Sequence, residues 1–333
     1  MYSVLYLIIF NAHTHTHFIM ATINVDFNPL SNTDTRHVLI VASSAQDAIA
    51  VAKDSMVVCG VAELQPWVLH AIQSMRASAE AVSTTDFTLP KISDEAVDEG
   101  SSHSSTVRLI ICLLPSNRAA RHNSPSKPHV VSSVVKSYCP SGNCLIVLVP
   151  ELAEYAFSQA CAVARCFPLH TMKTTNNGKD KAVNHSIVNL VVSIPEDCQS
   201  DQLLESIRLT IAQIRRCQEL VDTPPNILTT TQYVNIATTT ANDLGCDVTV
   251  ISGEQLKEQG LGGLFAVGQA SVHPPVLVVL SWYPPDGRRG GVHCADLPSI
   301  CLVGKGIIYD TGEAMHMKAQ LLSCIVHWTY CLT

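Results

Sequence analysis

Residues 37–42 read His-Val-Leu-Ile-Val-Ala, a short apolar run rich in β-branched side chains. Such a run, bounded by polar residues, predicts a buried β-strand. Three similar runs lie farther along the chain, at 107–114, 144–149 and 187–193. Stretches with helical character lie between the runs, at 45–54, 126–138 and 151–166. Alternating strands and helices predict a mixed or parallel α/β domain.

Residues 77–106 interrupt this alternation. They are rich in Ser, Thr, Asp and Glu and show no steady periodicity. A polar stretch of this kind is typical of a long surface loop. We therefore predict a flexible insertion at 77–106 within an amino-terminal α/β domain that covers residues 20–200.

A second domain is predicted from residue 201 onward. Behind Asp201, which is a good N-cap residue, apolar side chains recur at helical spacing, at Leu203, Leu204, Ile207, Ile211 and Ile214. Pro224 and Pro225 predict the end of this helix. Strand and helix patterns then alternate again, with strands at 246–251, 276–282 and 299–303 and a helix at 253–259.

The glycine-rich stretch at 260–268 has some likeness to a dinucleotide-binding loop. A dinucleotide fingerprint requires a strand before the glycines, whereas here a helix is predicted before them. We therefore interpret Gly260 as a helix C-cap. His122 and His273 lie in polar or proline-flanked segments, where a hydrogen-bonded or surface histidine is a simpler interpretation than an acid–base catalyst.

Composition indicates an ordinary cytoplasmic protein. The 333 residues are 47% hydrophobic and 15% charged, and the net charge of −7 provides no basic face for nucleic acid. Thirteen cysteines, an odd number without a repeating framework, indicate a reducing compartment. Cys139 with Cys144 and Cys161 with Cys166 are each interpreted as buried free thiols, with zinc ligation as the alternative.

The first 19 residues differ from the rest of the chain. Their apolar start is too short to span a bilayer and has no positively charged lead, and His13-Thr-His-Thr-His17 is a tract that could chelate a cation. We expect residues 1–19 to be a non-native or disordered leader, and the folded chain to begin at Met20. A secretory signal is the alternative. No membrane partner is expected.

Residues 303–312, which read Val-Gly-Lys-Gly-Ile-Ile-Tyr-Asp-Thr-Gly, place Lys305 and Asp310 after an apolar run. A lysine binds a metal only when its amine is neutral, and burial beside a divalent cation lowers its pKa. The carboxylate of Asp310 would supply a hard oxygen ligand suited to zinc, manganese or magnesium. The alternative is a tight turn with a solvated lysine.

This decapeptide resembles the segment with which leucyl (cytosol) aminopeptidases begin their two-metal centre. Upstream segments occur in the order and approximate spacing of the catalytic domain of that family, at 220–226, 260–269 and 274–280. Residues 121–126 and 160–171 resemble the amino-terminal domain of its aminopeptidase-like-1 branch. The resemblance extends over 108–312, and more loosely over 20–107.

The resemblance implies an amino-terminal α/β domain followed, at 201–312, by the opening part of a zinc-peptidase-like α/β/α catalytic domain. It implies removal of amino-terminal residues from peptide substrates by a two-metal hydrolytic mechanism, with zinc or manganese. Lys305 and Asp310 would be metal ligands, and Lys318 would be the catalytic lysine that stabilises the oxyanion. A homo-oligomer, a hexamer in the family, is also implied.

The sequence departs from the family after Gly312. Glu313 replaces a second glycine, Lys318 falls one position later than the family lysine, and the tail 313–333 has no family counterpart. Three further acidic ligands and an arginine of the family would lie beyond residue 333. We therefore expect a chain truncated inside the catalytic domain, with weak metal binding and impaired activity. The alternatives are a non-catalytic isoform that associates with full-length subunits, and a native protein that is complete because its reported carboxyl terminus is incorrect.

Overall fold

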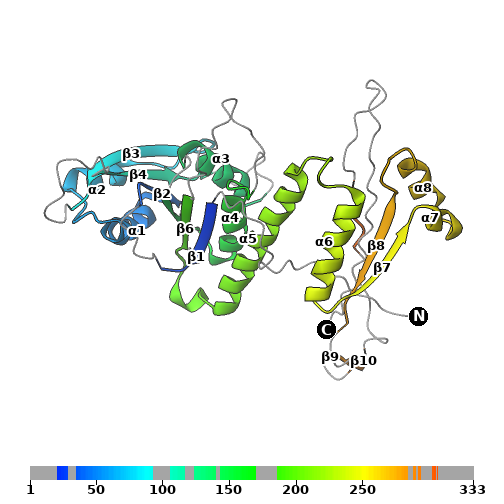
Figure 1. Ribbon diagram of the computed structural model, residues 1–333. Coiled ribbons are helices and arrows are strands. Elements are labelled where there is room, and N and C mark those ends of the chain that lie inside the picture. Colours follow the sequence, from blue (N-terminus) through cyan, green and yellow to red (C-terminus); the bar gives the residue numbers. More distant parts are fainter. Residues whose placement is uncertain are drawn as a thin grey trace, which may run out of the picture. The chain divides into compact units, whose positions relative to one another are not determined.

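The computed structural model describes residues 21–28, 35–92, 106–116, 124–139, 143–169, 186–283, 288–289, 292–293, 302–304 and 306. The predicted leader at 1–19 and tail at 313–333 lie outside these residues. The chain forms two compact units that divide between Glu219 and Leu220. Each unit has its own sheet structure, shown in Figure 1.

The amino-terminal unit is built on a six-stranded sheet in the order β1-β6-β5-β2-β4-β3. All neighbouring strands are parallel except β3, which runs antiparallel to β4. The strands are β1 Ala21–Asp26, β2 His37–Ala42, β3 Ser83–Pro90, β4 Thr106–Leu113, β5 Cys144–Val149 and β6 Ser186–Val192. In β2, the five residues after His37 are completely buried. A strand that is buried on both faces is apolar along its length, which explains the sequence of β2. The mostly parallel sheet confirms the predicted α/β class.

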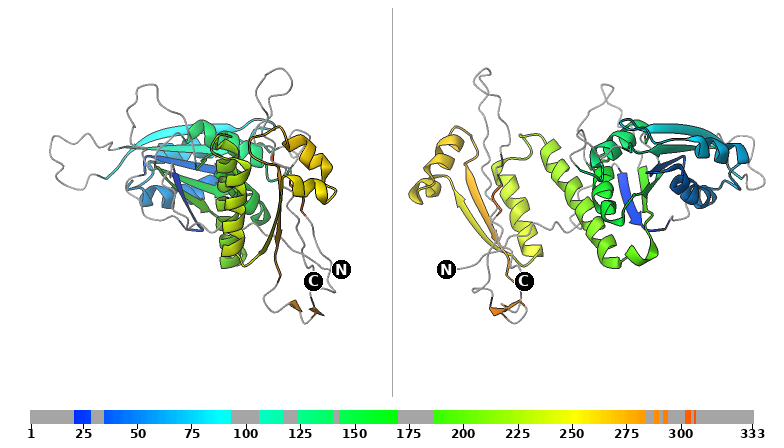
Figure 2. Two further views of the ribbon diagram at one scale, coloured as in Figure 1. Left: turned by 45° about the vertical axis from the view of Figure 1, so that its right-hand side comes forward. Right: turned by 180° about the vertical axis from the view of Figure 1, so that it is seen from behind.

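Helices cover both faces of this sheet (Figures 1 and 2). On one face lie α1 Ala45–Val58 and α2 Pro66–Ser74, packed on Val38 and Ile40. On the other face, packed on Leu39 and Val41, lie α3 Pro128–Tyr138, α4 Ala156–Ala164 and α5 Asp201–Asp222. Short 3-10 turns occur at η1 Ala153–Tyr155 and η2 Glu196–Cys198. None of the helices in the described part of the chain is long and apolar enough to cross a membrane.

An edge strand lies within the predicted flexible insertion at 77–106. Strand β3 pairs with β4 along its whole length, and Asp86 accepts a hydrogen bond from the Arg108 guanidinium at 2.5 Å. Phe87 and Leu89 are buried against the sheet, whereas Asp86, Thr88 and Pro90, which alternate with them, are exposed. Alternation of buried and exposed residues is typical of an edge strand. Because β3 is short and most of its positions are polar, its pattern is not recognisable within a polar segment. Residues 93–105 of the predicted insertion are outside the described part of the chain.

Helix α5 connects the two units. Ser200, and not the predicted Asp201, caps it, because the Ser200 hydroxyl accepts the N–H of Leu203 at 3.2 Å. The helix ends at Asp222, two residues before Pro224, as the sequence predicts. Its apolar face packs on the amino-terminal unit, with Leu204, Ile207 and Ile211 buried there. The sequence assigned this helix to the second domain, whereas the compact unit extends through Glu219.

The second unit contains, in chain order, α6 Thr230–Asp243, β7 Asp247–Ser252, α7 Glu254–Glu258, α8 Gly262–Gly268, β8 Val276–Ser281, β9 Arg288–Arg289 and β10 Val292–His293. Strands β7 and β8 are antiparallel, and α6 packs on them through Ala237 and Ala241. Of the strand predicted at 299–303, residues 299–301 lie outside the described residues, and Leu302 and Val303, which belong to no strand, are 45% and 67% exposed. No strand in the described residues pairs with them.

Candidate metal centre

The three predicted site residues, Lys305, Asp310 and Lys318, lie outside the described residues. The structure describes the neighbours of Lys305, Leu302–Gly304 and Gly306, whereas the neighbours of Asp310 and Lys318 also lie outside the described residues. Nowhere in the described ranges do three or more His, Cys, Asp or Glu side chains gather closely enough to hold a metal ion. If a divalent ion binds this chain as the resemblance implies, Lys305 and Asp310 are the residues that would hold it.

The glycine-rich stretch before the predicted centre is a helix junction. Gly260 follows Gln259, the C-cap residue of α7, with φ +79°, and it donates its N–H to the Lys257 carbonyl oxygen at 3.0 Å. Glycine adopts this left-handed conformation without strain, so the predicted role of Gly260 in ending the helix is confirmed, one position beyond the C-cap Gln259. Sequence reasoning did not find α8, which begins at Gly262, because glycine is a poor helix former.

Gly268, at the end of α8, fixes how closely this helix approaches the segment that leads into β8. A Cβ atom added at Gly268 would lie 2.2 Å from Cβ of Pro275. On the other side of the same proline, its carbonyl oxygen accepts the N–H of Gly253 at 2.9 Å. Pro275, just before β8, thus contacts α8 through Gly268 and the start of α7 through Gly253. His273 is half-buried beside it, with its backbone N–H donated to the Ser271 hydroxyl, and His122 is outside the described residues.

The cysteine pairs for which zinc ligation was the alternative interpretation lie in the amino-terminal unit. Cys139 and Cys144 are 7% and 0% exposed and belong to its core, which confirms their predicted packing role. The hydrogen bond to Cys144 and burial both raise the pKa of the Cys139 thiol. Cys161 and Cys166 are half-buried, and burial raises the pKa of the Cys161 thiol to about 11. Thiols that stay protonated are poor metal ligands and poor nucleophiles.

Comparison with known proteins matches both units. Residues 36–176 match the M17 aminopeptidase N-terminal domain 2, and residues 215–321 match the catalytic domain of the cytosol aminopeptidase family. The chain is similar to "Probable aminopeptidase NPEPL1" of Mus musculus, with 34% identity over 203 residues that make up 61% of this chain and 37% of the relative. It is also similar to "Leucine aminopeptidase 1" of Caenorhabditis elegans, with 34% identity over 58% of this chain and 36% of the relative.

A solved structure shares the fold. The leucyl aminopeptidase of Leishmania major, solved in complex with actinonin, aligns with a TM-score of 0.64 and 25% sequence identity, over 89% of this chain and 52% of that one. The amino-terminal α/β unit and the part of a catalytic domain that follows it correspond to the two family matches. The chain belongs to this family, the cytosol (leucyl) aminopeptidases. It spans 37% of the length of its Mus musculus relative.

Proposed function

We propose that the protein is a metal-dependent aminopeptidase that removes amino-terminal residues from peptides. The observation that carries this proposal is the match of residues 215–321 to the family's catalytic domain, because that match includes Lys305, Asp310 and Lys318. Lys305 and Asp310 would hold a divalent cation, zinc or manganese, as an amine and a carboxylate ligand. Two bound divalent ions would supply an activated water and polarise the scissile carbonyl group. Lys318 is the candidate for stabilising the oxyanion.

Metal binding by the 333-residue chain tests the proposed ligands first. Calorimetric titration with manganese and zinc should show binding that strengthens as pH rises, because the Lys305 amine must lose its proton before it ligates. Asp310→Asn should weaken binding by about tenfold or more, whereas Glu313→Gln, a nearby carboxylate not assigned as a ligand, should leave it unchanged. Equal binding by the parent chain and Asp310→Asn would contradict the assignment.

Hydrolysis of leucyl peptides, followed with and without a chelator, tests the reaction itself. The chain spans only 37% of the length of the relative, so we expect slow turnover from these residues alone. Turnover that persists after chelation and in Asp310→Asn would show that the reaction does not depend on the proposed metals.

We further propose that the protein resides in the cytoplasm and forms a homo-oligomer, a hexamer in the family. The nine cysteines in the described residues are all free thiols, which supports a reducing compartment. Cell fractionation would test the location. Sedimentation velocity would test the oligomer, and a single monomeric species at micromolar concentration would contradict it.

A further inference from the structure

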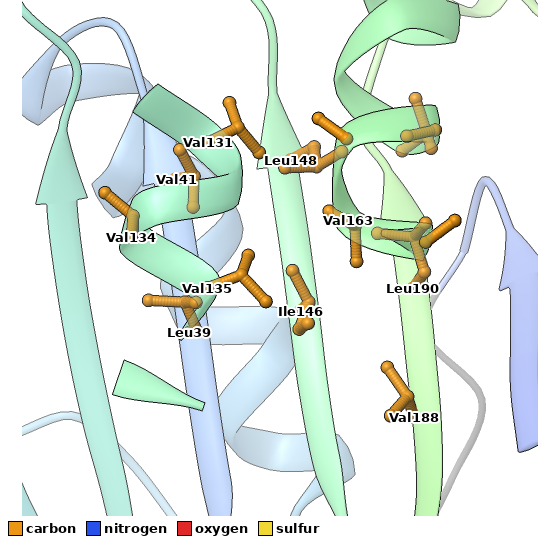
Figure 3. Close-up of a cluster of buried hydrophobic side chains, with 14 of the residues drawn as sticks. Leu39, Val41, Val131, Val134, Val135, Ile146, Leu148, Val163, Val188 and Leu190 are labelled. Carbon is orange, nitrogen blue, oxygen red and sulfur yellow. The ribbon is translucent and has the colours of Figure 1, made fainter. Parts of the chain in front are cut away.

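Helix α3 has one apolar face and one face that carries positive charge and hydroxyl groups. Figure 3 shows Val131, Val134 and Val135 of this helix directed at the sheet, against β2 and β5. The other side of α3 carries His129, Ser132, Ser133 and Lys136, spaced three and four residues apart. Residues at this spacing share one helix face.

These four side chains line a hollow of about 290 Å³, and Arg165 completes the lining. Arg165 ends α4, which packs beside α3 on the same face of the sheet. Two hydrogen bonds join the helices next to the hollow. The Ser132 hydroxyl donates to the Ala162 carbonyl oxygen at 2.9 Å, and the Cys166 thiol donates to the Ser132 carbonyl oxygen at 3.4 Å. The wall that carries the charges is therefore held in place by the fold.

The hollow is positively charged in a chain with excess negative charge. The whole chain has 28 acidic and 21 basic residues, yet neither α3 nor α4 contains an aspartate or a glutamate. Among the described residues, Lys136 and Arg165 take part in no ion pair. Both charges act on the Cys166 thiol. Burial raises the pKa of this thiol, and the charges of Lys136 and Arg165 each oppose that rise.

We propose that this hollow binds a phosphate group, either as inorganic phosphate or as part of a small phosphorylated molecule. The Arg165 guanidinium and the Lys136 ammonium group match a doubly charged oxyanion, and arginine binds phosphate in a planar, bidentate geometry. The exposed Ser133 hydroxyl and the His129 imidazole are further donors at the rim. A volume near the lower end for small-molecule pockets leaves room beyond the phosphate group itself. The site lies in the amino-terminal unit and is independent of the proposed peptidase reaction.

The test is a titration of the 333-residue chain with inorganic phosphate and, separately, with a sugar phosphate, with chloride at matched ionic strength as reference. Nuclear magnetic resonance of the His129 imidazole and calorimetry report binding. We expect a saturable response to phosphate and none to chloride. Lys136→Gln and Arg165→Gln should each weaken binding by about tenfold or more, as expected for a lost charge-assisted hydrogen bond.

The matched control is Lys53→Gln, which removes the same charge from the exposed side of α1 on the opposite face of the sheet. This variant should bind phosphate as the parent chain does. Tighter binding of the sugar phosphate would identify a phosphorylated metabolite as the ligand, whereas equal binding would identify the phosphate group alone. A response that does not saturate at millimolar phosphate, or an equal loss in Lys53→Gln, would overturn the proposal. Circular dichroism of each variant separates loss of binding from loss of fold.

Discussion

His37 begins the central strand of the sheet, and folding favours its neutral form. Burial is the largest cause that lowers its pKa, and the positive charges of Arg108 and Arg36 lower the pKa further. Its Nδ1 atom is buried and has no hydrogen-bond partner within the described part of the protein. The unfolded chain therefore binds a proton at this residue at a higher pH than the folded chain does.

We expect this difference to make the amino-terminal unit less stable in mild acid. As pH falls below about 6.5, the ordinary pKa of histidine, the unfolded state gains a proton that the folded state does not. His37→Gln should reduce the decrease in the free energy of unfolding between pH 7 and pH 5. Urea denaturation at several pH values measures this change, with His70→Gln, at an exposed position on α2, as control. An unchanged pH dependence in His37→Gln would contradict the role of His37.

Gly268 lies so close to Pro275 that its substitution tests the energetic importance of this contact. Because a Cβ atom there would clash with Pro275 at 2.2 Å, Gly268→Ala should destabilise the second unit by about 1–3 kcal/mol. Gly263→Ala lies in the same helix with nothing within 4 Å of the added atom, so it should be neutral or stabilise by up to about 1 kcal/mol. Hydrogen exchange of the β8 amides distinguishes the two. Equal exchange rates in both variants would show that the close approach has no energetic role.

Among the elements, α5 shows how far periodicity predicts packing. The apolar positions read from the sequence are those that meet the core, and arginines on the same helix add polar anchors. Arg208 donates to the Val25 carbonyl oxygen at 2.7 and 3.0 Å, and Arg215 donates to the Phe167 carbonyl oxygen at 2.8 Å. Burial lowers the pKa of Arg215 to about 10. These contacts join the helix to β1 and to the segment after α4.

The energetic consequence can be measured at two neighbouring positions. Ile211 is 4% exposed, so Ile211→Ala should lower the free energy of unfolding by about 2–5 kcal/mol through lost burial and a cavity. Leu209 is 45% exposed, and Leu209→Ala should change it by no more than about 0.5 kcal/mol. Chemical denaturation followed by circular dichroism measures both. Similar values for the two variants would mean that α5 does not contribute its buried face to the core.

For the molecule as a whole, the position of α5 sets the boundary of the first folding unit. Without α5, the apolar surfaces that cover Leu204, Ile207 and Ile211 would be exposed. We expect a fragment of residues 21–222 to unfold cooperatively and to resist protease, and a fragment of residues 21–200 to be less stable and to bind a hydrophobic dye. Equal stability of the two fragments would place the helix with the second unit instead.

Local patterns in the sequence were sufficient to predict β2, β4, β5 and β6, and α1, α3, α4 and α5, each to within a few residues. An apolar run or a helical repeat is a property of neighbouring residues and needs no distant partner. The family, and with it Lys305, Asp310 and Lys318 as candidate site residues, also followed from the sequence, through short motifs in a shared order. The geometry of those three residues stays a prediction, because they lie outside the described part of the chain.

Only the tertiary structure decided the strand order, the edge position of β3, the unit that holds α5 and the hollow between α3 and α4. Each depends on contacts between residues far apart in the chain. Helical spacing places His129 and Lys136 on one face, but nothing in the sequence shows that Arg165 lies opposite them. The capping of α5 shows the same limit at short range, because Ser200 and Asp201 are both good caps and only the hydrogen bond to Leu203 distinguishes them. The sequence by itself therefore determined the helices and strands whose pattern is local, whereas packing decided elements such as β3 and α8 and which side chains meet.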